Sequence, residues 1–290
     1  MKTNNNIKNF NKYYKHYQKE GYVLVKNFLS KQKCKQALNW LNSKNKKKLA
    51  KSWTELEPGV DLAIYFVVHG GNSPVAKLAN NKKVLDFASK LVDDEVYIYS
   101  SKVNLKAAWC GAVEYFHQDL VYWRDRGYPR DDMLSAMVFL ESHNDDNAPL
   151  NIFPKTHKLG FIKHEPFINL NGLAKFMVPP KKLSILKKKY GVTKINAEPG
   201  DVLFFHMACV HGSGHNISPA SRTVVLSQLN ARGNVPTNVE KNSKKFNLKR
   251  AKKEYDESKR RFKWFRNKYT KQLKSKKLTF SAPIVNEEKY

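Results

Sequence analysis

A histidine and a carboxylate lie two residues apart in the stretch Tyr115–Trp123, which is rich in aromatic and β-branched side chains. Positions i and i+2 of a strand share one face, so His117 and Asp119 are expected to aim a nitrogen and an oxygen at one point. One more histidine would complete the two-histidine, one-carboxylate set that binds non-haem Fe(II). The triplet alone is weak evidence, because the chain has nine histidines and chance explains one such triplet about as well.

Three histidines near residues 198–216 are candidates for the third ligand. A Pro-Gly-Asp turn there leads into an apolar strand. His206 lies within that strand and is equally consistent with a satisfied core histidine, whereas His215 lies in a Gly/Asn-rich turn typical of the surface. His211 lies between them, where the backbone is still extended. The residues alone give His211 only a modest preference and leave the choice open.

Arg222 lies at the start of the next apolar strand, in the stretch Ser221–Leu226. A buried guanidinium needs an anionic partner, and its planar fork suits a bidentate carboxylate. An exposed arginine at the end of a strand explains the pattern equally well.

Short apolar segments separated by turn residues dominate the chain from Val103 to about residue 231. Their density favours an antiparallel sandwich or barrel over a βαβ sheet. The N-terminal third is expected to be mixed, and an irregular insert at 156–195 is expected to hold one helix. The predicted helices are 8–20, 30–41 with Ser30 as N-cap, 73–92 and 180–190, and the early strands are 22–25, 61–67 and 95–99.

The net charge of +28 is the strongest compositional signal. Such a charge is typical of proteins that bind nucleic acid, an anionic membrane surface or an acidic ligand. The basic residues are mostly lysines scattered towards both ends, which favours a solvated surface over specific nucleic-acid binding. A basic helix predicted at 243–275 has one apolar face and is expected to pack on its own protein. A nucleic-acid-binding protein with a vestigial metal site remains the alternative from another functional class.

Hydrophobic residues make up 41% of the 290, enough for a substantial core. No window approaches the roughly 18 uncharged apolar residues that span a bilayer, and the N-terminus has no apolar leader segment. Three widely spaced cysteines fit a reducing compartment. We therefore expect a cytoplasmic monomer or homodimer, with one domain at 1–235 and a helical extension at 236–290.

Several short motifs occur together in a fixed order. They are HQD at His117–Asp119, APLNIFPKTH at Ala148–His157, PGDVLFF, HGSGHN at His211–Asn216 and SR at Ser221–Arg222. The set resembles the phytanoyl-CoA dioxygenase family of Fe(II)- and 2-oxoglutarate-dependent oxygenases, from about Gly21 to Ala231. Within that range, SKVNLK, HQDLVYW and NISPASR are most similar to the ectoine-hydroxylase-like branch.

The resemblance implies a mainly β, α+β fold with a double-stranded β-helix, a jelly roll of the cupin type. It implies Fe(II), 2-oxoglutarate as cosubstrate and O2, with ascorbate as an aid in vitro. The site residues that it implies fall into three groups. They are His117, Asp119 and His211 as iron ligands, Arg222, Lys106, Ser213 and Asn216 around the cosubstrate, and Trp123 and Tyr122 on the substrate wall.

The reaction implied by the resemblance is hydroxylation of an unactivated C–H bond, with release of succinate and CO2. Asp119 argues for hydroxylation, since related halogenating enzymes carry a small residue at that position. A small metabolite, an amino acid or an ectoine-like derivative, is the expected substrate, with an acyl-CoA or a natural-product precursor as alternatives. A 2-oxoglutarate sensor is a further alternative. Ala148–Leu150 and Pro154–His157 depart from the usual Gly-Pro-Leu and Pro-Gly-Ser-His, which leaves room for a different substrate.

Overall fold

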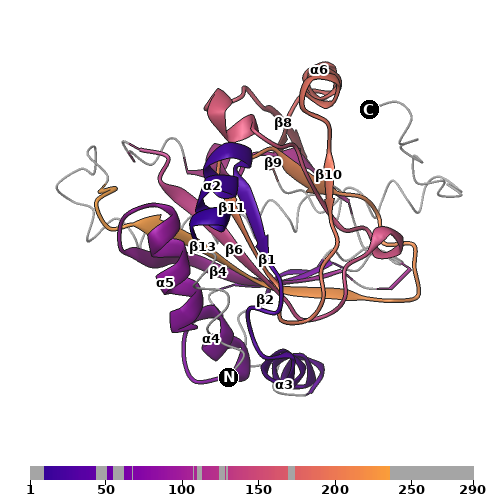
Figure 1. Cartoon of the computed structure of the whole chain (residues 1–290). Coiled ribbons are helices and arrows are strands. Elements are labelled where there is room, and N and C mark those ends of the chain that lie inside the picture. Colours follow the sequence, from indigo (N-terminus) through magenta and orange to yellow (C-terminus); the bar gives the residue numbers. More distant parts are fainter. Residues whose placement is uncertain are drawn as a thin grey trace, which may run out of the picture.

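The computed structural model describes most of the first 235 residues (Figure 1). The described ranges are 10–43, 51–54, 62–66, 68–106, 108–109, 113–123, 128, 130–168 and 174–235. The basic helix predicted at 243–275, and with it the proposed extension at 236–290, lies outside these ranges and stays a prediction.

The N-terminal helices match the predicted positions, with two corrections. The helix predicted at 73–92 is two helices, because Asn80 and Asn81 interrupt it: Asn80 bonds the His69 carbonyl through its amide, and Asn81 caps the next helix by accepting from the Lys83 N–H. Ser30 precedes its helix as predicted, but its side chain makes no capping hydrogen bond. The four helices are α2 Phe10–Glu20, α3 Lys31–Asn42, α4 Pro74–Ala79 and α5 Lys82–Leu91.

A seven-stranded sheet forms the larger layer of the described chain, in the order β1-β11-β6-β13-β4-β3-β2, and every neighbouring pair is antiparallel. The predicted strands at 22–25 and 61–67 are confirmed, and β2 was not predicted. The bounds are β1 Tyr22–Val25, β2 Lys51–Thr54, β3 Leu62–Phe66, β4 Val96–Lys106, β6 Met133–Phe139, β11 Val202–His206 and β13 Arg222–Ala231.

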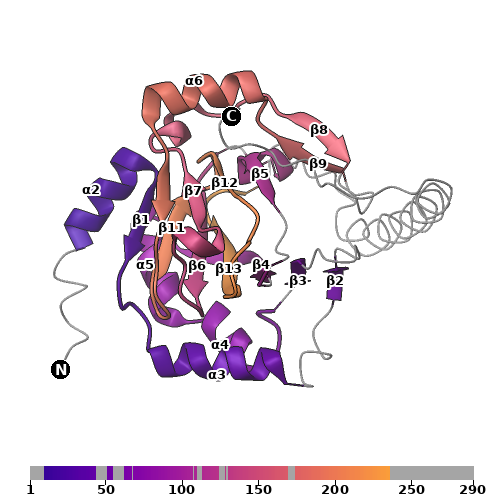
Figure 2. The same ribbon diagram turned by 90° about the vertical axis from the view of Figure 1, so that its right-hand side faces the viewer.

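A four-stranded antiparallel sheet, in the order β10-β7-β12-β5, faces the larger sheet. A separate hairpin of β8 and β9 lies beside α6 (Figure 2), and neither this hairpin nor β10 was predicted within the insert. The helix predicted at 180–190 is confirmed. The bounds are β5 Glu114–His117, β7 Leu150–Ile152, β8 Glu165–Ile168, β9 Ala174–Met177, α6 Pro180–Tyr190, β10 Thr193–Ile195 and β12 His211–Ser213.

Alternation along the large sheet divides the core into two layers. On β13, Val225 packs in the cluster that the N-terminal helices cover, whereas Val224 and Leu226 face the small sheet. From the small sheet, Leu150 and Ile152 meet these inward-facing side chains. Two antiparallel sheets enclosing one interior, with helices on the outer face, confirm the predicted mainly β architecture. Among the described residues, no helix is both long and apolar enough to cross a lipid bilayer.

Candidate metal and cosubstrate site

The iron-ligand candidates come from two paired strands and a turn. His117 ends β5 and His211 begins β12, and the two residues are direct partners across these strands. Asp119 is not on the strand as predicted: β5 ends at His117, and Asp119 opens a 3-10 turn, Asp119–Tyr122. The turn still brings the carboxylate to the imidazoles, so the predicted convergence is found although its strand geometry was wrong.

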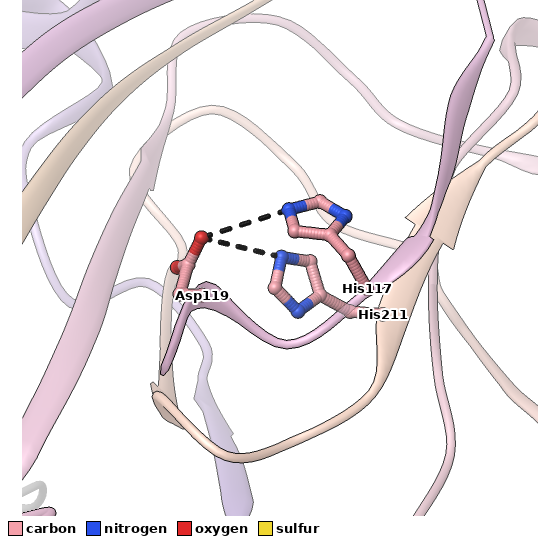
Figure 3. Close-up of side chains that lie close together, drawn as sticks. All are labelled: His117, Asp119 and His211. Carbon is pink, nitrogen blue, oxygen red and sulfur yellow. Dashed lines mark ion pairs between the residues drawn. The ribbon is translucent and has the colours of Figure 1, made fainter. Parts of the chain in front are cut away.

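The three side chains point toward one another (Figure 3). Asp119 Oδ1 lies 3.7 Å from His117 Nε2 and 3.9 Å from His211 Nε2. One ligand atom from each residue lies within 4.8 Å of the others. Asp119 and His211 are buried, whereas His117 is partly exposed. Two imidazole nitrogens and one carboxylate oxygen are the donor set of the non-haem Fe(II) oxygenases, so these residues fit an iron ion.

Backbone contacts fix which imidazole nitrogens face the carboxylate. His117 Nδ1 lies 2.7 Å from the Tyr115 carbonyl oxygen, and His211 Nδ1 lies 3.0 Å from that of Cys209. A carbonyl only accepts, so each Nδ1 carries the hydrogen and each Nε2 presents a lone pair. Burial lowers the pKa of His211 to about 4, which keeps this imidazole neutral at pH 7.

Asp119 is held as an oriented carboxylate. Burial opposes its ionisation, but the neighbouring His117, His211 and Lys102 outweigh that effect and hold its pKa well below the ordinary range. The hydroxyl of Ser135, on β6, donates to Asp119 Oδ2 at 2.9 Å. This bond leaves Oδ1 directed at the histidines, so Ser135 orients the carboxylate, a role that the sequence did not reveal.

A second polar group lies where β4 ends and β13 begins. Lys106 and Arg222 are direct partners across these strands, and both donate to the Ser213 hydroxyl, at 2.8 Å and 2.9 Å. Arg222 is only 7% exposed, and its Nε is buried without a hydrogen-bond partner among the described residues. Burial lowers its pKa to about 10, so it remains a cation. Two buried cations beside one hydroxyl are suited to an anionic ligand.

The remaining predicted residues occupy different surroundings. Asn216 is buried in the loop between β12 and β13, where its side chain donates to the Ala220 carbonyl and accepts from Ser218. Tyr122 lies with its ring 5.9 Å from that of His117, and Trp123 lies 4.5 Å from the ring of Tyr99. Tyr122 therefore lies beside the metal-site candidates, whereas the hydrogen bonds of Asn216 stabilise the loop between β12 and β13.

The other two histidine candidates lie apart from the cluster. His206 packs against Tyr17 and His157, with ring centroids 6.5 Å and 5.4 Å away, and His215 is exposed. Of the three, only His211 joins the group formed with His117 and Asp119.

Lys102 and Asn104 also face the interior, and neither was among the predicted site residues. The register pairs Lys102 with Leu226 and Asn104 with Val224, and both partners belong to the cluster between the sheets. The signal in the sequence is that Lys102, Asn104 and Lys106 alternate along one strand and therefore share one face. Polar residues at inward positions of an otherwise apolar interior indicate a ligand-binding wall.

Gln118, between two ligand candidates, was also missed. Its buried amide donates to the carbonyls of Gly160 and Ala208 and accepts from the Ile162 N–H, at 2.7–2.8 Å. The Gln118 N–H donates to His164 Nε2. One side chain thus connects the metal-ligand turn to two other loops.

Replacing Gln118 with leucine should lower the free energy of unfolding by about 2–4 kcal/mol, because several buried polar groups lose their partners. Urea unfolding of the metal-free protein measures this loss. Gln18→Leu is the matched control: Gln18 is exposed and donates to the Leu91 carbonyl at the surface, so its replacement should cost less. Equal losses in both variants would contradict the role assigned to Gln118.

Acid should also destabilise the metal-free protein through buried histidines. Burial lowers the pKa of His164 and of His206 to about 4. Each histidine therefore binds a proton at about pH 6.5 in the unfolded chain but only at about pH 4 in the folded chain. The free energy of unfolding is therefore highest above pH 6.5 and falls as the pH drops toward 4. Between pH 7 and 5 we expect a loss of about 2 kcal/mol for each histidine. In His164→Gln, the drop in the free energy of unfolding between pH 7 and 5, measured with urea, should be smaller by about 2 kcal/mol. A drop equal to that of the unsubstituted protein would contradict the role of His164 in acid sensitivity.

Comparison with known proteins gives the family. The family model of phytanoyl-CoA dioxygenase matches residues 17–224. The chain belongs to the phytanoyl-CoA dioxygenase family. It is 31% identical over 186 residues to an ectoine dioxygenase of Sphingopyxis alaskensis, a match that spans 61% of each chain. It is 27% identical over 179 residues to L-proline trans-4-hydroxylase of Streptomyces griseoviridis, covering 58% of this chain and 67% of that enzyme.

A solved structure agrees with this assignment. The crystal structure of EctD from S. alaskensis with 2-oxoglutarate and 5-hydroxyectoine superposes with a TM-score of 0.64 at 28% identity, covering 79% of both chains. The same enzyme has been solved with bound Fe. This family member is thus an Fe(II)- and 2-oxoglutarate-dependent dioxygenase with the expected jelly-roll fold.

Proposed function

We propose that the protein hydroxylates a C–H bond of a small polar metabolite, an amino acid or a close derivative, using Fe(II), 2-oxoglutarate and O2. The observation that carries this proposal is the pairing, within one jelly-roll interior, of a His-Asp-His cluster with a buried Lys-Arg pair. The cluster suits iron, and the cationic pair suits the far carboxylate of a dicarboxylic acid.

The residue roles follow from the contacts. His117 and His211 offer Nε2 lone pairs to iron, and Asp119 offers Oδ1 while Ser135 holds its other oxygen. Arg222 and Lys106 bind the distal carboxylate of 2-oxoglutarate, with Ser213 holding the two cations beside each other. When bound, the iron and the cosubstrate supply the oxidising power for inserting an oxygen atom from O2 into the substrate. The protein positions both groups and keeps water away from them.

The substrate class rests on the relatives. Two enzymes similar to this chain are named for ectoine and for L-proline. The wall formed by Lys102 and Asn104 adds a cation and an amide near the metal cluster, which suits a ligand bearing a carboxylate. These two relatives therefore favour a small metabolite over an acyl-CoA or a natural-product precursor.

Succinate formation tests the proposal. Full-length protein with Fe(II), ascorbate and 2-oxoglutarate should release succinate faster when the correct member of a panel of amino acids and their cyclic derivatives is added, with hydroxylated product in equal amount. Mn(II) in place of Fe(II) is the control and should give no product. An absence of substrate-stimulated succinate across the panel would contradict the proposed substrate class, while binding of 2-oxoglutarate without any turnover would favour a sensor.

A further inference from the structure

A histidine with no role so far, His143, lies inside the jelly roll near the cationic pair. Its backbone forms an isolated antiparallel bridge with Ala197, whose side chain belongs to the interior cluster. Residues opposite each other in such a bridge share a face, so the imidazole also points inward. Its ring meets Phe139 edge-on, with centroids 4.6 Å apart. Phe139 pairs with Val224, two residues beyond Arg222.

The imidazole of His143 is closed off from water and unsatisfied. The residue is 1% exposed, and both ring nitrogens are buried without a hydrogen-bond partner among the described residues. Burial, together with the positive charges of Arg222 and Lys106, holds its pKa well below the ordinary range, so the ring is neutral. A neutral imidazole still carries one N–H donor, and leaving a buried donor unpaired costs about 1–3 kcal/mol.

Unused donors therefore gather at one end of the interior. Arg222 Nε is also buried without a partner among the residues described. The surroundings of His143 include the apolar side chains of Phe139 and Ala197, which offer neither donors nor acceptors. A carboxylate bound between the cations offers about four acceptor lone pairs. A two-pronged bond from Arg222 and one bond from Lys106 would use three of them, which leaves one for the imidazole N–H of His143.

We propose that His143 donates its ring N–H to the carboxylate held by Lys106 and Arg222, and is thus a binding residue for the distal end of the cosubstrate. The inference rests on the proposed function, which places a dicarboxylate between the iron and the cationic pair. His143 would raise the affinity for 2-oxoglutarate and favour ligands that have a distal carboxylate. The iron ligands lie at the other end of the cosubstrate, where the reaction takes place.

The role of His143 is tested by the affinities for two ligands and by the thermal stability of the ligand-free protein. Calorimetry on full-length, Mn(II)-loaded protein measures the Kd of 2-oxoglutarate and of oxalate, which chelates metal but lacks a distal carboxylate. In His143→Leu, the Kd of 2-oxoglutarate should rise about ten- to a hundredfold, as expected for one hydrogen bond to a charged group, with the Kd of oxalate unchanged. His143→Gln, which retains an N–H donor, should recover part of the affinity.

Thermal unfolding of the ligand-free variants separates binding from structure. Because His143 lacks partners in the described structure, His143→Leu should leave the ligand-free Tm unchanged or raise it. His206→Leu is the control: His206 is a half-buried histidine away from the cations that accepts from the Ala208 N–H, so its replacement should lower Tm with no change in either Kd. A lower Tm with an unchanged Kd for 2-oxoglutarate in His143→Leu would overturn the inference.

Arg222→Leu distinguishes this inference from the proposed function. If the unsubstituted protein fails to bind 2-oxoglutarate, or if Arg222→Leu binds it normally, the proposed function itself fails. If Arg222→Leu loses affinity while both His143 variants keep it, only the role of His143 is overturned.

Discussion

Replacing Asp119 with alanine is expected to abolish substrate-dependent succinate formation and to weaken iron binding by at least about a hundredfold. Asp119 supplies the carboxylate in the His-Asp-His cluster. Even the loss of a group that is merely hydrogen-bonded to a metal ligand typically costs ten- to a hundredfold in affinity or activity, so the loss of a ligand should cost more. Metal analysis after anaerobic reconstitution and gel filtration measures the iron retained.

The Ser135 hydroxyl, which orients Asp119, should have a smaller effect on iron binding than Asp119 itself. Ser135→Ala removes the bond to Asp119 Oδ2 and should reduce iron affinity or activity by about ten- to a hundredfold. Asp86→Ala is the control, because Asp86 pairs with Lys82 on the exposed face of α5 and should retain full activity. Full iron occupancy in Asp119→Ala would contradict the assignment of this carboxylate as a ligand.

Replacing Arg222 with leucine should weaken 2-oxoglutarate binding by about a hundredfold or more without lowering iron content. Removing one partner of a buried, hydrogen-bonded charge pair costs about 2–5 kcal/mol, and a hundredfold loss of affinity, about 2.7 kcal/mol, lies within that range. The effect should appear as a higher KM for 2-oxoglutarate and a higher Kd on Mn(II)-loaded protein. The iron ligands come from other elements, so the metal content should stay at the level of the unsubstituted protein.

Arg232 provides the matched control for this prediction. It lies just beyond the same strand and pairs with Glu95 at the surface. Arg232→Leu should therefore leave the KM for 2-oxoglutarate unchanged. Equal KM values in Arg222→Leu and the unsubstituted protein would contradict the assigned role of Arg222.

The sequence predicted the fold through local patterns and ordered motifs. Alternation and turn residues located β11 and β13 closely, and helical spacing located α2 and α6. These elements have strong periodicity, so the local signal and the tertiary structure agree. The single helix predicted at 73–92 was wrong because apolar periodicity continues across Asn80 and Asn81, although their side chains bond and cap the backbone there.

The sequence could predict those site residues whose role depends on residue type and on the order of motifs along the chain. Residue types and the family resemblance selected His117, Asp119 and His211, and the structure brings their side chains together. The path of the chain at Asp119 was predicted wrongly, because the strand ends at His117 and a 3-10 turn begins at Asp119. Gln118 and His143 were missed for a different reason. Their importance lies in which buried atoms have partners and which have none, a property of packing that no spacing in the sequence encodes.

Iron bound by His117 and His211 as proposed would act as a reversible cross-link, because the two residues are direct partners across their strands. The two residues face each other across β5 and β12, although the segment between them contains the insert, α6 and β6. An ion held by both closes a loop of roughly a hundred residues, a constraint that polymer models value at about 4–5 kcal/mol of denatured-chain entropy. Iron loss should thus relax the intervening segment as well as stop the chemistry, and proteases should cut the iron-free enzyme there first.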